Sequence, residues 1–146
     1  MNKTTIKKQH KETQPMGVFK SALDNINIEE SKLSCAQALQ TRAAENGFEF
    51  PTAEQAFDKC VEEMNEFMAA IDAKDIQAQE EEFGDLIFAL TNYARMNNIN
   101  AEEAVHKANH KFINRFQSME KSVDKTGITL KDLSLEQLLD LWKKQK

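Results

Sequence analysis

The chain has 146 residues, a formal net charge of −5 at pH 7 and a sequence pI near 5.3, which leaves room for one domain and an extension but not for two full cores. Four glycines and two prolines are too few for the many turns of an all-β fold, and the 40% hydrophobic and 29% charged residues suit a helix-rich globule rather than a disordered chain. The net negative charge excludes a protein that holds nucleic acid by bulk electrostatic attraction.

Residues 1–30 are polar at their start and show no helical periodicity, so we expect a flexible N-terminal extension ahead of a helical domain over residues 31–146. The start of the chain has no apolar signal core, and nowhere does it approach the roughly 18 apolar residues of a membrane span. The two cysteines, Cys35 and Cys60, have no zinc-binding spacing and require no oxidising compartment. We therefore expect a cytoplasmic protein without a membrane partner.

Capping residues and breakers divide the remaining sequence into helices. Thr52 followed by Gln55, and Asn100 followed by Glu103, are capping boxes, and Gly47 is a helix stop. Helices are expected over about 31–46, 52–72, 75–98 and 100–125, with a short last helix opened by Thr129 or Ser134. Short links between long helices favour antiparallel neighbours, so the predicted fold class is an all-α antiparallel helical bundle.

An internal repeat relates the two central helices. Residues 62–71 align without a gap on residues 81–90, with acid on acid and apolar on apolar at nearly every position. In an antiparallel hairpin, two such helices present the same face to each other. Within this repeat, Gly84 is the only glycine in a predicted helix interior, where it costs about 1 kcal/mol relative to alanine. It indicates close approach of either a packed helix or a ligand.

The repeat places one acidic pair on each helix at the same edge of the apolar face. At about 100° per residue, Glu63 falls at the margin of the apolar arc of its helix, and Glu66 lies about 60° further out. On the next helix, Glu82 falls inside the arc and Asp85 lies outward by the same angle. Two carboxylates 4 Å apart repel by about 4 kcal/mol at an effective dielectric of 20. Such a cluster favours a bound divalent cation, and the alternative is a solvated acidic rim.

Basic residues on the fourth predicted helix have the spacing of a phosphate clamp. Lys111 and Arg115 are one turn apart at one edge of its apolar stripe, and Asn109 lies at the other edge. A solvated basic flank is the alternative interpretation. Lys59, one turn before Glu63, is either a further phosphate contact or part of a salt-bridge relay.

These blocks resemble the MazG-type nucleoside triphosphate pyrophosphohydrolases. The resemblance is carried by Glu63-x-x-Glu66, Glu82-x-x-Asp85 and residues 107–116 (KANHKFINRF), and it covers about residues 36–144. It implies an all-α bundle of the all-α NTP pyrophosphatase type, completed by oligomerisation as a homodimer or a dimer of dimers. The implied reaction is Mg²⁺-dependent cleavage of an NTP or dNTP to the monophosphate and pyrophosphate, with Mn²⁺ as the alternative ion, in nucleotide-pool housecleaning.

The resemblance also implies a role for individual residues. Four acids would hold magnesium: Glu63, Glu66, Glu82 and Asp85. Lys59, Lys111 and Arg115 would contact phosphates, Asn109 would contact a phosphate or the sugar, and Glu62 or Glu63 is the candidate catalytic base. A narrower dUTP or phosphoribosyl-ATP pyrophosphohydrolase and a non-catalytic helical interaction protein remain as alternatives. The preferred base and the phosphorus attacked stay open at this stage.

Overall fold

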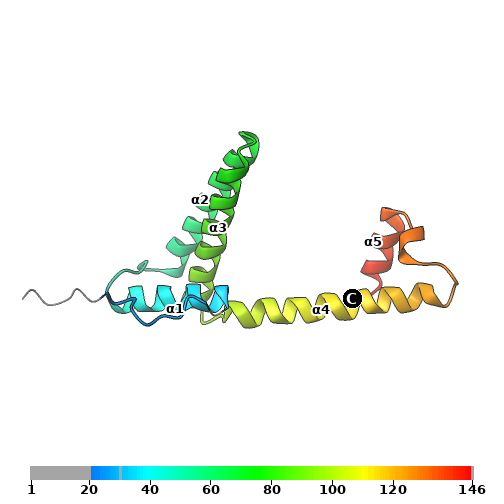
Figure 1. The fold of residues 1–146 in the computed structure, drawn as a ribbon, viewed down its shortest axis with the longest axis horizontal. Helices are drawn as coiled ribbons and strands as arrows, with labels where there is room; N and C mark the ends of the chain where they lie inside the picture. Colours follow the sequence, from blue (N-terminus) through cyan, green and yellow to red (C-terminus); the bar gives the residue numbers. More distant parts are fainter. Residues whose placement is uncertain (1–20, 30, 146) are drawn as a thin grey trace, which may run out of the picture.

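The computed structural model describes residues 21–29 and 31–145, and over these residues the secondary structure is entirely helical (Figure 1). The helices are α1 (Lys32–Glu45), α2 (Ala53–Asp72), α3 (Ile76–Met96), α4 (Ala101–Asp124), the short 3₁₀ helix η1 (Leu130–Asp132) and α5 (Leu135–Lys143). The all-α prediction is confirmed. The predicted extension, residues 1–30, lies mostly outside the described residues. In the part of the chain described, no helix is long and apolar enough to cross a membrane.

The helix starts follow from the capping chemistry read in the sequence. The Thr52 side chain accepts from the backbone N–H of Gln55, and the Asn100 side chain accepts from that of Glu103. Each bond satisfies one of the amide groups that a helix leaves unpaired at its start. At the other end of α1, Gly47 adopts a φ of +87°, a left-handed conformation that glycine takes without steric cost. This turn directs the following link toward α2.

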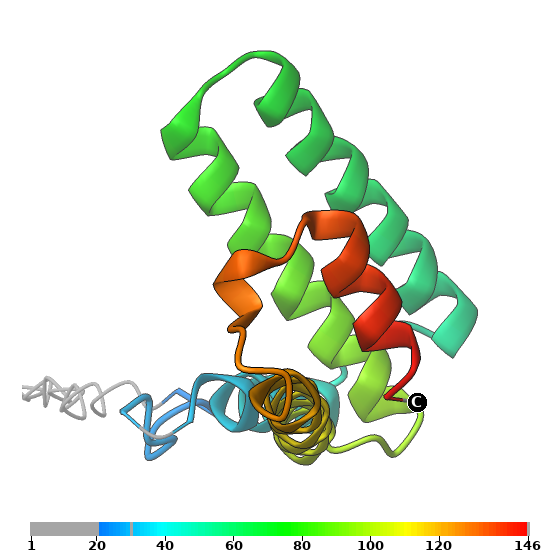
Figure 2. The same cartoon turned by 90° about the vertical axis from the view of Figure 1, so that its right-hand side faces the viewer.

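Helices α2 and α3 form an antiparallel hairpin that rises from the rest of the fold (Figures 1 and 2). Three contacts fix its register from the tip to the open end: Gln79 Nε2 donates to the carbonyl of Ala70 at 3.3 Å, the Phe67 and Phe83 rings lie 5.8 Å apart, and the Phe57 and Tyr93 rings lie 5.4 Å apart. This register sets which acids of the repeat meet.

Helix α1 packs against the C-terminal half of α3 through buried polar contacts. Gln40 and Thr91 are both buried, and the Gln40 amide donates to the carbonyl of Phe88 at 2.8 Å and to the Thr91 hydroxyl at 3.2 Å. The Gln37 amide oxygen accepts from the first backbone N–H of α4, that of Ala101, at 3.1 Å. Satisfied polar groups of this kind fix the crossing of α1 over α3 and the start of α4.

Helix α4 extends away from the hairpin, and α5 folds back onto its far half (Figure 1). Met119 and Val123 are buried there, whereas Val105, Phe112 and Phe116 on the same stripe are at least 40% exposed. A single copy of the chain therefore covers only part of the apolar face that the α4 sequence provides.

The apolar arc of α2 is divided in the same way. Its small residues, such as Ala56 and Cys60, are buried in the hairpin. A second stripe of large side chains is between 43% and 55% exposed: Phe57, Val61, Met64, Met68 and Ile71. The alternating spacing of four and three residues is that of a helix seam made to pack on another helix. The structure thus leaves this stripe of α2 about half exposed among the described residues, although the Phe57 ring at its start packs on Tyr93 of α3.

Candidate functional site

Three of the four acids predicted to bind metal come together between α2 and α3. One carboxylate oxygen from each of Glu63, Glu66 and Glu82 lies within 4.8 Å of the other two. Glu63 is only 6% exposed, Glu82 is half-buried and Glu66 is exposed. The acid nearer the apolar arc of each helix is therefore the more buried member of its pair, as the helical wheel predicted.

The cluster carries charge that the protein itself does not satisfy. Oε2 of Glu63 and Oε2 of Glu82 are buried and have no hydrogen-bond partner among the described residues. The negative charge of Glu63, followed by desolvation and the charge of Glu82, raises the pKa of Glu66. A buried unsatisfied polar atom costs about 1–3 kcal/mol, and more when it is charged. Carboxylate oxygens are the ligands that Mg²⁺ and Mn²⁺ take, so these three residues fit a divalent cation.

Lys59 is the counter-charge nearest to the cluster. Its Nζ lies 2.6 Å from Oε1 of Glu63 and 2.8 Å from Oε1 of Glu62, and these hydrogen bonds raise the pKa of Lys59. The structure therefore shows Lys59 in ion pairs with acids three and four residues further along α2. Glu62 is exposed and lies outside the group of three acids.

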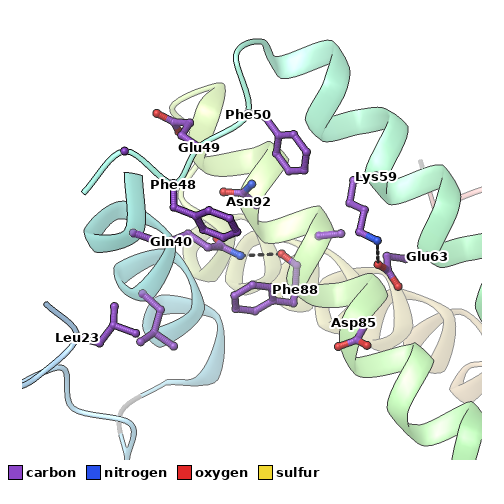
Figure 3. Close-up of a pocket in the computed structure, with 14 residues that line it drawn as sticks. Leu23, Gln40, Phe48, Glu49, Phe50, Lys59, Glu63, Asp85, Phe88 and Asn92 are labelled. Atoms are coloured by element: carbon purple, nitrogen blue, oxygen red, sulfur yellow. Dashed lines mark hydrogen bonds and ion pairs between the residues drawn. The ribbon is translucent and has the colours of Figure 1, made fainter. Parts of the chain in front are cut away.

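Asp85, the fourth acid of the predicted set, is exposed one turn after Glu82 and is not in the 4.8 Å group. It lines a pocket together with Glu63 and Lys59 (Figure 3). The acidic cluster therefore borders this pocket, and Asp85 lies on its wall.

The pocket has a volume of about 750 Å³ and lies between α1, the link after it, α2 and α3 (Figure 3). The charged residues Glu49, Lys59, Glu63 and Asp85 line it beside a set of aromatic and apolar side chains that includes Leu23, Leu39, Phe48, Phe50 and Phe88. A pocket with charged groups on one part of its wall and aromatic rings on another suits a ligand that has both an anionic and a flat aromatic portion.

Sequence reasoning missed the aromatic part of this pocket. The segment between Gly47 and Pro51 lies outside the predicted helices and was assigned no functional residue, yet Phe48, which is 84% exposed, and Phe50 both line the pocket. Two aromatic residues in a short link between helices were the available signal. Leu23, within the predicted extension, also lines the pocket.

The basic residues of α4 lie in a different place. Lys111 and Arg115 line a second pocket of about 780 Å³ between α4 and Gln145, which follows α5. The Arg115 guanidinium sits 3.8 Å above the Trp142 ring and donates to the Trp142 carbonyl at 2.9 Å. Asn109 is exposed and lines neither pocket. Neither of these two pockets contains both the acidic cluster and the basic pair.

Gly84 has no close neighbour among the residues that the structure describes. A Cβ built at Gly84 would meet no atom within 4 Å among the described residues. Because the space beside Gly84 is open, we interpret the glycine as making room for a ligand or for a helix of another copy.

Comparison with known proteins finds a matching domain family and related sequences. The MazG nucleotide pyrophosphohydrolase domain model matches residues 52–119. The chain is 38% identical over 126 residues to nucleoside triphosphate pyrophosphohydrolase/pyrophosphatase MazG of Thermotoga maritima, covering 86% of this chain and 48% of the relative. It is 38% identical over 131 residues to a nucleoside triphosphate pyrophosphohydrolase of Escherichia coli K12, covering 86% of this chain and 49% of the relative.

The chain thus spans about half the length of these two relatives. The segment matched by the domain model contains all of α2 and α3 and most of α4, so it includes the acidic cluster and the basic pair. By this match, residues 52–119 of the chain belong to the MazG nucleotide pyrophosphohydrolase domain family.

Proposed function

We propose that this protein is a divalent-metal-dependent nucleoside triphosphate pyrophosphohydrolase that converts an NTP or dNTP and water to the monophosphate and pyrophosphate. The observation that carries the proposal is the group of Glu63, Glu66 and Glu82, with two buried and unpaired oxygens, beside a pocket with aromatic walls. The names of the relatives from Thermotoga maritima and Escherichia coli support the same reaction. Housecleaning of the nucleotide pool is the biological role that we propose.

In this mechanism, Glu63, Glu66 and Glu82 would hold Mg²⁺, with Mn²⁺ as the alternative ion and Asp85 as the fourth proposed ligand. An ion held there would neutralise the triphosphate charge and polarise the phosphorus that is attacked. Lys59 lines the same pocket and is the proposed phosphate contact on α2.

The chemical step transfers one proton and exchanges one bond. The oxygen of a water molecule bonds to phosphorus, the bond from that phosphorus to the leaving phosphate oxygen breaks, and Glu62 or Glu63 accepts the water proton. Lys111 and Arg115 stabilise the charge that develops on the phosphates, and Asn109 contacts a phosphate or the sugar. The side chains that bind therefore come from α2, α3 and α4.

We propose that two copies of the chain complete this site, as a homodimer or a dimer of dimers. The exposed stripe on α2 and the open face at Gly84 support packing against another copy. Because α4 carries Lys111 and Arg115 away from the hairpin (Figure 1), these residues would reach the triphosphate held by the acids of another copy. Most homo-oligomers close by such a symmetric exchange of contacts.

Two alternative functions differ in how they would use the acidic cluster of Glu63, Glu66 and Glu82. A non-catalytic interaction protein would leave its acids solvated, which the 6% exposure of Glu63 and the unpaired oxygens disfavour. A narrower dUTP or phosphoribosyl-ATP pyrophosphohydrolase would use the same acids and is separated only by relative turnover.

The deciding experiment incubates the protein with Mg²⁺ or Mn²⁺ and a panel of NTPs, dNTPs, dUTP and phosphoribosyl-ATP, and identifies the products. We expect monophosphate and pyrophosphate in equal amounts. Reaction in ¹⁸O-labelled water then locates the phosphorus attacked. If no nucleotide of the panel releases pyrophosphate with Mg²⁺ or with Mn²⁺, the proposed function is overturned.

A further inference from the structure

The side-chain amide of Asn92, on the wall of the pocket beside the acidic cluster, has a fixed orientation. Asn92 of α3 lines the pocket, and its Oδ1 accepts from Nε of Arg95 at 3.2 Å and from Nη2 of Arg95 at 3.1 Å. Nη2 of Arg95 also forms an ion pair with the Glu49 carboxylate. The Arg95 side chain is only 17% exposed. It is paired with Glu49, which lines the same pocket, and together Glu49 and Arg95 form a support that holds the Asn92 amide.

This support determines which end of the Asn92 amide is available. A guanidinium group has only donors, so the atom that it contacts must be the amide oxygen, and the amide cannot rotate by 180° without losing both bonds. The Nδ2 group, with its two N–H donors, is left without an acceptor in the part of the chain that the structure describes. Figure 3 shows the Asn92 amide among the aromatic side chains of this end of the pocket.

The other amide of the pocket is already in use. Gln40 donates through Nε2 to the carbonyl of Phe88 and to the Thr91 hydroxyl, so it serves the packing of α1 on α3. Lys59, the cation of the pocket, is paired with Glu62 and Glu63 beside the acidic cluster. At the aromatic part of the wall, Asn92 is thus the side-chain amide whose donors remain available.

We propose that Asn92 determines base specificity by donating a hydrogen bond from Nδ2 to a ring nitrogen or carbonyl acceptor of the nucleobase, and that Arg95 and Glu49 position it. The inference rests on the proposed function, because the triphosphate must lie at the acidic cluster for the base to lie among Phe48, Phe50 and Phe88. In this apolar setting, a base without an acceptor leaves the Asn92 donor unpaired, and that discriminates against it.

The test compares two triphosphates in wild type and in Asn92→Asp. One is the deoxynucleotide that wild type cleaves best; the other carries indole, which has a flat ring system but no hydrogen-bond acceptor. The aspartate keeps the side-chain shape and the contact with Arg95 and replaces the donor by an acceptor. We expect kcat/KM for the natural substrate to fall about tenfold, the size of one lost hydrogen bond, with little change for the indole substrate.

The quantity compared is the ratio of kcat/KM for the natural substrate to kcat/KM for the indole substrate. The added negative charge acts equally on both triphosphates, so it does not change this ratio. Asn65→Asp is the matched control, because it makes the same chemical change at an exposed position of α2 that does not line the pocket. Asn92→Leu, which removes the donor without adding charge, should lower the same ratio. Arg95→Lys keeps the positive charge but loses the two-point contact, and it should lower the ratio through KM.

An equal loss on both substrates in Asn92→Asp would assign Asn92 a purely structural role and overturn the inference, as would an unchanged ratio. If wild type cleaves no triphosphate, the proposed function fails, and binding of the free nucleosides decides the inference separately. NMR titration with a natural deoxynucleoside and with indole deoxyriboside should then show a preference for the natural compound that Asn92→Asp abolishes. If wild type shows no preference for the natural deoxynucleoside over indole deoxyriboside, the inference about Asn92 is overturned.

Discussion

The Nζ of Lys59 lies 2.6 Å from Oε1 of Glu63, while Oε2 of the same carboxylate is buried without a partner. One side chain therefore has a cation on one oxygen and an unsatisfied position on the other. A lysine ammonium neutralises a carboxylate but does not cover both of its oxygens. This geometry explains how the metal-free protein tolerates the buried charge of Glu63. A divalent ion at Oε2 would satisfy the oxygen that Lys59 leaves unpaired.

Removing charge from the cluster should separate metal binding from stability. We expect Glu82→Gln to lower activity at least about 100-fold, to abolish the thermal shift produced by Mg²⁺, and to raise the melting temperature of the metal-free protein, because repulsion at the cluster is relieved. Glu81→Gln is the control, since it removes the same charge from an exposed position outside the group of three acids. Equal effects of the two variants in thermal-shift and activity assays would contradict the assigned metal site.

Lys59→Met should move metal affinity and substrate affinity in opposite directions. Loss of the ammonium removes the cation that shares Glu63 with a metal, so Mg²⁺ should bind several-fold more tightly in calorimetry. The same change removes the proposed phosphate contact, so KM for the triphosphate should rise. The Glu63 side chain is only 7% exposed, so loss of its cation should also lower the free energy of unfolding of the metal-free protein; circular dichroism checks that the helices persist. Weaker binding of both metal and substrate would argue against competition at Glu63.

The raised pKa of Glu66 gives the metal-free protein a defined pH dependence. Near and above the ordinary value of 4.5, the folded chain retains a proton that the unfolded chain has released. The free energy of unfolding should therefore rise as pH falls through the raised pKa, and this gain is lost as pH increases. Urea denaturation in EDTA at several pH values checks this. Glu66→Gln should flatten that part of the profile, and an identical slope in both proteins would refute the assignment.

The exposed stripe on α2 should be an interface between copies. Met68→Glu places a charge in the middle of that stripe, so light scattering should show a shift to monomer while circular dichroism retains the helical signal. Asn65→Glu adds the same charge at an exposed position of α2 outside the stripe and should leave the assembly unchanged. A monomeric wild type at micromolar concentration would exclude the proposed assembly.

A shared site between copies predicts complementation. Glu82→Gln and Arg115→Ala should each be inactive, because one lacks a metal ligand and the other a phosphate contact. If the acids of one copy work with Arg115 of the other, mixing the two variants should restore about a quarter of wild-type activity, from the intact site in each mixed dimer when subunits exchange at random. Exchange is followed by tagging one variant. Mixed dimers that remain inactive would place the complete site within one chain.

Local chemistry in the sequence was sufficient for the helices and for the inner members of the acidic pairs. Thr52, Asn100 and Gly47 act within a few residues of themselves, so their effect on helix ends could be read without a fold. The position of Glu63 at the margin of the apolar arc follows from helical periodicity alone, and the structure buries it.

The meeting of residues far apart in the chain depended on tertiary structure. The Asn92–Arg95 contact joins residues three apart on α3 and follows from helical spacing. No local pattern indicates that Arg95 also pairs with Glu49, or that Phe48 and Phe88 line one pocket, because these contacts depend on how α1 and the link after it lie against α3. Likewise, periodicity identifies the apolar arc of α2, but only the packed hairpin shows which half it covers and which half it leaves exposed. Side-chain periodicity is a property of each helix by itself, whereas a pocket and an exposed seam are properties of how helices are placed against one another.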